Sequence, residues 1–187
     1  TNTVERSYLW GQDLSGTLQG AGGVGGLLAM TTTDTNSGTY LATTGANGNG
    51  LGLVGSQGAA AAIYEYGPFG EPVRVSGVVA GQNPFRFSTK YTDDETGLIY
   101  YGYRYYNSIT GRWINREPLG EASFFEMYRS QKPFTWWPFL EKSALLPSYA
   151  FAYNEPIRHI DIDGAVIGAD DAVIIGGGIT AADYIAS

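Results

Sequence analysis

The stretch FRFSTKYTDDETGLIYYGYRYYN, residues 85–107, decides the fold class of this protein. Its first part alternates aromatic with polar residues, as a strand with one buried face does. The acidic turn Asp93–Gly97 leads into the tyrosine-rich run Leu98–Tyr106, and the turn Asn107–Gly111 leads into Arg112–Ile114. Strand-like runs joined by short turns predict an all-β fold built from hairpins.

A short unit recurs on both sides of this stretch. It reads aromatic, any residue, aromatic, followed by a turn that closes with glycine, and its copies are Tyr8–Trp10 with Gly16, Tyr64–Tyr66 with Gly70, and Tyr103–Tyr105 with Gly111. Aromatic residues two positions apart point to the same face of a strand. Stacked copies are therefore expected to line one face of a sheet with tyrosines, which is a structural role.

The composition excludes several kinds of site. The chain has 187 residues, which indicates one domain or at most two. It has no cysteine and a single histidine, His159, so thiolate and His-His metal sites are excluded and no cofactor is expected. A net charge of -7 argues against a nucleic-acid surface. No signal peptide is recognisable, and no apolar run is long enough to span a membrane.

Composition also divides the chain into three regions. Residues 1–63 are rich in glycine and nearly uncharged, which fits either a low-complexity linker or, as we favour, a β-meander with degenerate repeats. Residues 64–164 carry the strand patterns, interrupted by a possible short helix at Glu121–Arg129 and a tryptophan-rich cluster at Trp136–Leu140. Residues 165–187 are expected to be a glycine-rich linker or the start of a further segment.

The central stretch resembles a known family. Residues 85–107, continued by 110–120, resemble the RHS-repeat-associated core domain of bacterial Rhs and YD-repeat proteins. Tyr64–Glu71 looks like a YD repeat, and Tyr149–Ile157 followed by Asp161–Gly164 looks like the closing motifs of that domain. The resemblance covers residues 64–164, with a weaker extension over residues 7–26.

The resemblance implies a fold and a role. Family members wind β-hairpins into a hollow shell, the C-terminal part of a bacterial polymorphic toxin, and the core domain closes one end of it. The expected partners are the chain's own C-terminal cargo, the rest of a larger YD-repeat chain, secretion machinery and the surface of a target cell. The expected localisation is secreted or at the cell surface. A non-cleaving module for adhesion or contact at the cell surface is the alternative.

The resemblance also implies an aspartic autoprotease, whose carboxylates match Glu117 and Asp161, with Arg116 beside the first and Asp163 as a further carboxylate in the second motif. Peptide hydrolysis by carboxylates needs two of them, one protonated and one ionised. Cleavage is expected after Gly164-Ala165. The motifs depart from the family's Asp-Pro-x-Gly, since Glu117 replaces the first aspartate and Ile162 replaces the second proline.

Simpler interpretations stand beside this one. Arg116 and Glu117 fit an ordinary surface pair, and Asp161 with Asp163 fits a turn that Gly164 closes. His159 invites a role as a general base, but the family pattern does not require it. The run Gly176–Ala181 resembles a dinucleotide fingerprint without the elements that should follow it. Asp93–Glu95 is expected to be an exposed acidic turn and not a calcium site.

Overall fold

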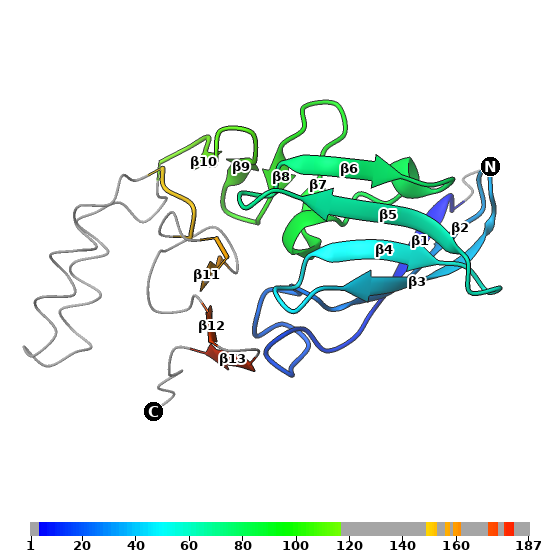
Figure 1. Cartoon of the computed structure of the whole chain (residues 1–187), viewed down its shortest axis with the longest axis horizontal. Coiled ribbons are helices and arrows are strands. Elements are labelled where there is room, and N and C mark those ends of the chain that lie inside the picture. Colours follow the sequence, from blue (N-terminus) through cyan, green and yellow to red (C-terminus); the bar gives the residue numbers. More distant parts are fainter. Residues whose placement is uncertain are drawn as a thin grey trace, which may run out of the picture.

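The structure is a computed structural model that describes residues 4–116, 149–152, 156–157, 159–161, 172–175 and 178–181. In this part of the chain the strands form three antiparallel sheets, and two short 3-10 helices lie between the first sheet and the second along the chain (Figure 1). The predicted all-β fold is therefore confirmed. The short helix expected at Glu121–Arg129 and the cluster Trp136–Leu140 lie outside the described residues.

The largest sheet is a six-stranded meander in which each strand pairs with the next along the chain. Its strands are β1 (Arg6–Trp10), β2 (Leu27–Thr32), β3 (Gly38–Thr44), β4 (Gly50–Val54), β5 (Ala60–Tyr66) and β6 (Pro72–Ser76). The turn between β3 and β4 contains Asn47-Gly48, with Gly48 at φ +75°. Glycine takes this left-handed conformation without steric cost, so the turn is set by local sequence.

One face of this sheet is covered by the chain that follows β6. Cross-strand neighbours on this face include Met30 opposite Tyr40 and Leu53 opposite Ala62. The segment Gly77–Gln82, which ends in helix η1 (Ala80–Gln82), places Val79 and Ala80 in the same cluster. The buried Tyr64 hydroxyl donates to the Ala80 carbonyl over 3.0 Å. Each fully buried large side chain here stabilises the fold by about 1.5–3 kcal/mol.

The second sheet contains the residues that decided the fold class. Its order is β10-β9-β8-β7, with β7 (Tyr91–Thr92), β8 (Ile99–Tyr100), β9 (Tyr105–Asn107) and β10 (Arg112–Trp113). The run Leu98–Tyr106 is thus two paired strands and not one, since Tyr100 lies opposite Tyr105. The Tyr101 N–H donates to the Arg104 carbonyl across the turn, and Gly102 has φ +115°.

This turn corrects the expectation for the third aromatic unit. Tyr103 lies in the turn, 68% exposed, and shares no strand face with Tyr105. The buried rings come instead from neighbouring positions, and the cluster they form contains Phe87, Ile99, Tyr101, Tyr106, Trp113, Phe151 and Ala152. Phe151 reaches it because Ala150 pairs with Arg112 and the Trp113 N–H donates to the Tyr149 carbonyl over 3.0 Å.

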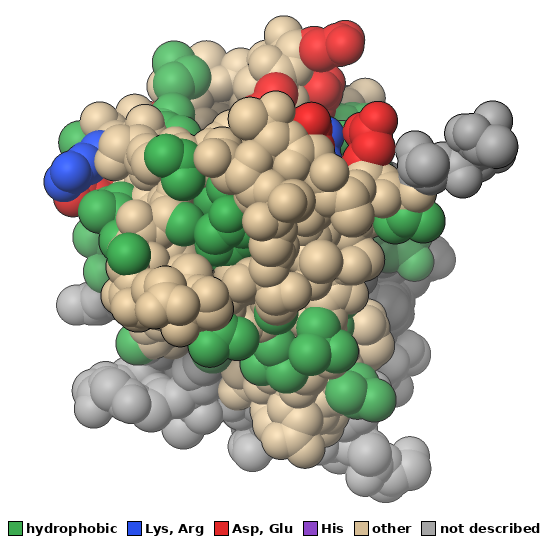
Figure 2. All heavy atoms as spheres, turned by 90° about the vertical axis from the view of Figure 1, so that its right-hand side faces the viewer, with side chains coloured by type: hydrophobic (Ala, Val, Ile, Leu, Met, Phe, Trp, Pro, Cys, Tyr) green, Lys and Arg blue, Asp and Glu red, His purple; other side chains and the backbone are tan. Residues whose placement is uncertain are grey.

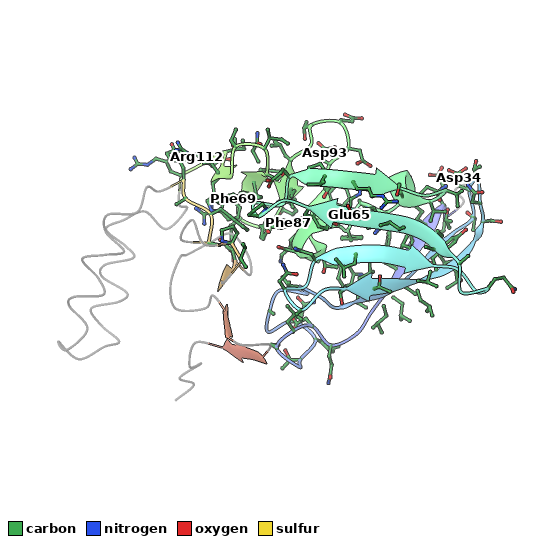
Figure 3. The ribbon with its side chains drawn as sticks, in the orientation of Figure 1. Asp34, Glu65, Phe69, Phe87, Asp93 and Arg112 are labelled. Carbon is green, nitrogen blue, oxygen red and sulfur yellow. The ribbon has the colours of Figure 1, made fainter. Side chains whose placement is uncertain are left out.

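Helix η2 (Phe87–Thr89) joins the two sheets. Ser88 and Thr89 have φ of +50° and +53°, a conformation that is strained for a residue other than glycine. The Ser88 N–H donates to Asn49 Oδ1 over 2.7 Å, while Thr89 Oγ1 accepts from the Gly25 N–H and donates to the Gly48 carbonyl. These bonds fix the strained helix between the two glycine-rich turns. Figure 3 shows Phe69 and Phe87 at this junction and Arg112 pointing away from it.

A small third sheet comes from the C-terminal region. It has the order β11-β12-β13, with β11 (His159–Ile160), β12 (Ala172–Ile175) and β13 (Gly178–Ala181). A dinucleotide fingerprint needs a helix to start at its glycine run. Residues Gly178–Ala181 form a strand instead, antiparallel to β12, so the resemblance to that fingerprint has no structural basis.

Candidate functional site

Two buried charges of opposite sign meet at the edge of the aromatic cluster. Arg104 and Asp161 are each 1% exposed, and the Arg104 Nη2 atom lies 3.7 Å from Asp161 Oδ2. The Arg104 guanidinium also lies over the Trp113 ring, 4.0 Å from its centroid. Burying either charge alone would be costly, so the ion pair and the cation-π contact together compensate that cost.

Different elements supply these three side chains. Arg104 immediately precedes β9, where the turn from β8 directs it inward, and Trp113 lies on β10. Asp161 immediately follows β11 of the third sheet. Rings of Tyr101, Tyr106 and Phe151 surround Trp113 at centroid distances of 5.2, 5.5 and 5.4 Å. We call Arg104, Trp113 and Asp161 the buried charge site.

The four residues predicted from the sequence have different positions. Asp161 is in the buried charge site, whereas Arg116 is exposed, a few residues after β10. Glu117 and Asp163 lie outside the described residues. His159 is on β11.

Sequence reasoning missed Arg104, although it lies within the decisive stretch. A signal was present, because Arg104 is a charged residue inside a run of five tyrosines that the pattern predicts to be half-buried. A charge in such a run, with an acidic motif elsewhere in the chain, suggests a buried ion pair. The spacing of the acidic residues in the sequence did not indicate which of them would pair with Arg104.

The acidic turn next to β7 is a separate feature. Asp93 accepts hydrogen bonds from Thr96 Oγ1 and from the Glu95 N–H. These bonds, the Thr96 bond most of all, lower the pKa of Asp93. Asp94 pairs with Arg86 at 2.9 Å. The described residues contain no group of three or more His, Cys, Asp or Glu side chains placed to hold a metal ion.

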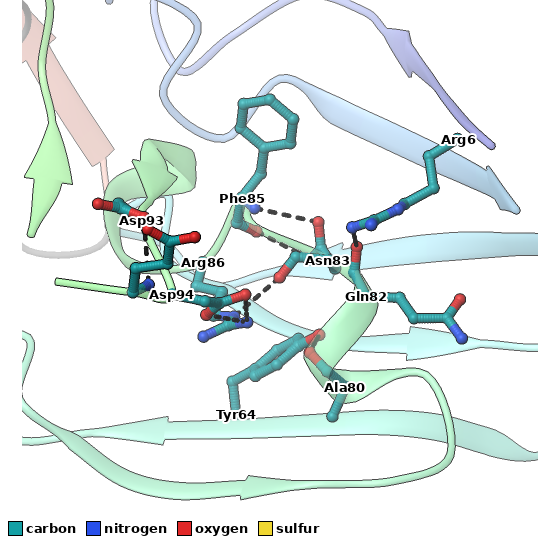
Figure 4. A network of polar contacts seen from close by, with 10 residues as sticks. Arg6, Tyr64, Ala80, Gln82, Asn83, Phe85, Arg86, Asp93 and Asp94 are labelled. Carbon is teal, nitrogen blue, oxygen red and sulfur yellow. Dashed lines mark hydrogen bonds and ion pairs between the residues drawn. The ribbon is translucent and has the colours of Figure 1, made fainter. Parts of the chain in front are cut away.

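Arg86 connects that turn to the large sheet. Its Nε donates to the Asn83 carbonyl over 2.8 Å, and its guanidinium lies 5.9 Å from the centroid of the Tyr64 ring (Figure 4). Nearby, Arg6 on β1 donates to the Gln82 carbonyl. A cleft of about 420 Å³ lies beside these residues, lined by Arg6, Tyr8, Pro84, Phe85, Tyr91, Asp93, Asp94 and Glu95. Figure 2 shows acidic side chains gathered along the upper edge of one face.

A second buried carboxylate is structural. Asp13, in the loop between β1 and β2, accepts hydrogen bonds from Ser15 Oγ and from the N–H groups of Ser15, Ala21 and Gly23. Burial by itself raises the pKa of Asp13, but these hydrogen bonds outweigh it and the pKa is lowered. The carboxylate therefore holds the glycine-rich loop closed.

Two tyrosine hydroxyls also have a structural role, as hydrogen-bond donors. Burial raises the pKa of both Tyr66 and Tyr106, so their hydroxyls stay protonated. Tyr66 donates to the Gly50 carbonyl over 2.8 Å, and Tyr106 donates to the Phe69 carbonyl over 2.7 Å. These bonds link neighbouring strands and turns.

No family model matches the chain. Among curated proteins it is 31% identical over 129 residues to salivary gland surface protein 1 of Aedes aegypti, covering 66% of this chain and 3% of that protein. It is 34% identical over 79 residues to toxin subunit YenC2 of Yersinia entomophaga, covering 41% and 8%. It is 32% identical over 102 residues to double-stranded DNA deaminase toxin A of Burkholderia cenocepacia, covering 51% and 7%.

Solved structures share the fold. The TcdB2-TccC3 crystal structure matches with a TM-score of 0.54 at 24% identity, over 73% of this chain and 6% of that one. The Photorhabdus luminescens Tc holotoxin pore matches with a TM-score of 0.53 at 22% identity, over 82% and 6%. The chain thus spans less than a tenth of these much longer proteins. Among the described residues, no helix has the length and apolar character of a membrane span. The chain is thus similar in sequence to segments of bacterial toxins, and it shares its β-rich fold with the Tc toxin structures.

Proposed function

We propose that this chain is the closing part of a toxin shell, an Rhs-associated core domain at residues 64–164 that holds and releases the segment after it. The relatives' toxin names and the shared β-rich fold support the shell role. The observation that carries the proposal further is the burial of Asp161 against Arg104. A charged motif residue fixed in a dry cluster is unusual for a simple surface turn.

The reaction we assign is self-cleavage after Gly164-Ala165. Asp161, beside a permanent cation, acts as the ionised carboxylate and takes a proton from water as the water oxygen attacks the peptide carbonyl carbon. Glu117 or Asp163 supplies the protonated partner, which donates to the amide nitrogen as the C–N bond breaks. Arg116 stabilises the negative charge that develops on the carbonyl oxygen. The products are a carboxylate on Ala165 and an amine on Val166.

Partners and localisation follow from the shell role. Large apolar side chains are exposed on the strands of the six-stranded sheet, among them Leu9, Leu28, Leu41 and Leu51. Exposed apolar surface of this kind is typical of a contact surface. We assign it to the rest of a larger YD-repeat chain, and we place the whole protein outside the cell that makes it, secreted or at its surface.

The similarity to a salivary gland surface protein favours a second candidate. In this alternative the same β-fold is a contact module at a cell surface and does not cut itself. Both candidates use the tyrosine-rich sheets as a scaffold, and they differ in whether the chain after residue 165 is released.

The mass of the intact protein distinguishes the two. Wild type is expected to lose residues 166–187, while Asp161→Asn keeps its full mass. Asp34→Asn, which changes an exposed carboxylate, serves as the control and should cleave like wild type. Full-length mass in wild type and Asp161→Asn alike, with near-UV circular dichroism of a folded protein, would overturn self-cleavage and leave the contact module.

A further inference from the structure

We propose that Arg104 is the positioning residue of Asp161: it fixes the carboxylate at the edge of the aromatic cluster in the geometry that self-cleavage requires. This inference rests on the proposed function and adds a residue to it that the acidic motifs do not contain. Arg104 acts through Asp161 and need not touch the peptide bond that breaks.

The first argument is the way Asp161 is attached. Asp161 follows β11, whose backbone pairs with β12 in the third sheet and not with either sheet of the core. The ion pair to Arg104 therefore connects this part of the chain to the aromatic cluster through a side chain. The ion pair therefore contributes to the position of the carboxylate.

The second argument is that Arg104 itself has little freedom. Its guanidinium lies 4.0 Å from the centroid of the Trp113 ring, and its carbonyl accepts the hydrogen bond that closes the turn from Tyr101. Trp113 is in turn fixed edge-on to Tyr101 and Phe151. A planar cation stacked on a fixed ring places its positive charge within narrow limits.

The third argument concerns cost. Burial of an arginine costs the free energy of its lost hydration, which other contacts must compensate. An arginine at the surface would pair with an acid at a smaller desolvation cost. Arg86 makes the same two kinds of contact, with Asp94 and Tyr64, but its acid partner is half exposed and its aromatic contact is longer. The buried charge site thus differs from the Arg86–Asp94 pair in that both of its charged side chains are fully buried.

The test measures the rate of self-cleavage in the full chain by pulse-labelling and gel analysis. The thermal unfolding of each variant is measured separately in an Asp161→Asn background, where cleavage is blocked. Arg104→Met removes the charge and keeps the volume, and it is expected to slow cleavage by about 100-fold, the cost of a displacement of roughly 1 Å. Arg104→Lys keeps the charge without the stacked plane and is expected to slow it by only about tenfold.

Arg86→Met is the matched control, since it removes an arginine that has an aromatic and an acid partner elsewhere in the fold. Its cleavage rate is expected to stay within about twofold of wild type. The rates are compared at a temperature at which every variant is fully folded, because Arg104→Met is also expected to be less stable than wild type. If Arg104→Met cleaves like wild type there, or if Arg104→Lys cleaves no faster than Arg104→Met, the inference is overturned.

The two proposals fail in different ways. Loss of cleavage in Asp161→Asn with normal cleavage in Arg104→Met would reject the positioning role and keep the proposed function. Absence of cleavage in wild type would reject the proposed function, and the positioning role with it.

Discussion

The ring of Phe151 stacks on the ring of Tyr106, with centroids 4.0 Å apart and planes inclined by 25°. This contact attaches residues 149–152 to the second sheet, and it places Phe151 within reach of Trp113 and thereby of the buried charge site. The position of Asp161 therefore depends on an aromatic cluster that is assembled from both ends of residues 64–164.

Truncating Phe151 tests that dependence. Phe151→Ala is expected to lower the free energy of unfolding by about 3–5 kcal/mol, because it removes a fully buried ring and leaves a cavity. Tyr103→Ala, which removes a ring that is 68% exposed, is expected to change it by less than about 0.5 kcal/mol. Urea denaturation followed by tryptophan fluorescence measures both. Similar values for the two variants would contradict the packing described for Phe151.

The fold class was predictable from sequence, because aromatic alternation and Gly-containing turns act locally. Residues 85–107 indicated hairpins, and hairpins are present. The break at Tyr101–Arg104 was not predicted, since the tyrosines on both sides of Gly102 are good strand formers and the turn depends on tertiary packing. The pairing of Arg104 with Asp161 could not be predicted either, because the two residues are far apart in the sequence and no repeat pattern relates their positions.

The glycine-rich loop between β1 and β2 is expected to depend on the Asp13 carboxylate. Asp13→Asn keeps the shape of the side chain but replaces a charged acceptor oxygen with an amide group. It is expected to lower the free energy of unfolding by about 2 kcal/mol at pH 7. The pKa of Asp13 is lower in the folded protein than in the unfolded chain. The stabilisation is therefore complete above the unfolded pKa of about 3.9 and is lost as pH falls through the folded pKa.

Urea denaturation of wild type and Asp13→Asn at pH 7 and at about pH 3 checks this sign. The difference between the two proteins should shrink at the lower pH. Asp34→Asn, at an exposed carboxylate, is the control and should change stability little at either pH. A difference that grows on acidification would show that the Asp13 carboxylate is not the stabilising form.

Gly77 illustrates a glycine that the fold requires. It has φ +118°, and a Cβ atom there would lie 2.3 Å from the Ala61 carbonyl oxygen and 2.7 Å from Ala62 Cα. Gly77→Ala is expected to lower the free energy of unfolding by about 3 kcal/mol or more, because neither backbone contact can move away easily. Gly81→Ala is the matched control, since a Cβ at Gly81 would meet nothing within 4 Å. Equal stability of the two variants would contradict the close approach of the 77–82 segment to β5.

The last prediction concerns stability at the buried charge site, separately from cleavage. Asp161→Leu leaves the buried Arg104 without its acid partner and is expected to lower the free energy of unfolding by about 3–5 kcal/mol. Arg104→Met is expected to cost a similar amount, because it leaves a buried carboxylate. The double variant should recover most of the loss, since an apolar pair has no charge to desolvate. Denaturation of the three variants gives the coupling energy directly. Simple additivity of the two losses would show that Arg104 and Asp161 do not interact, and the position of Asp161 would then need another cause.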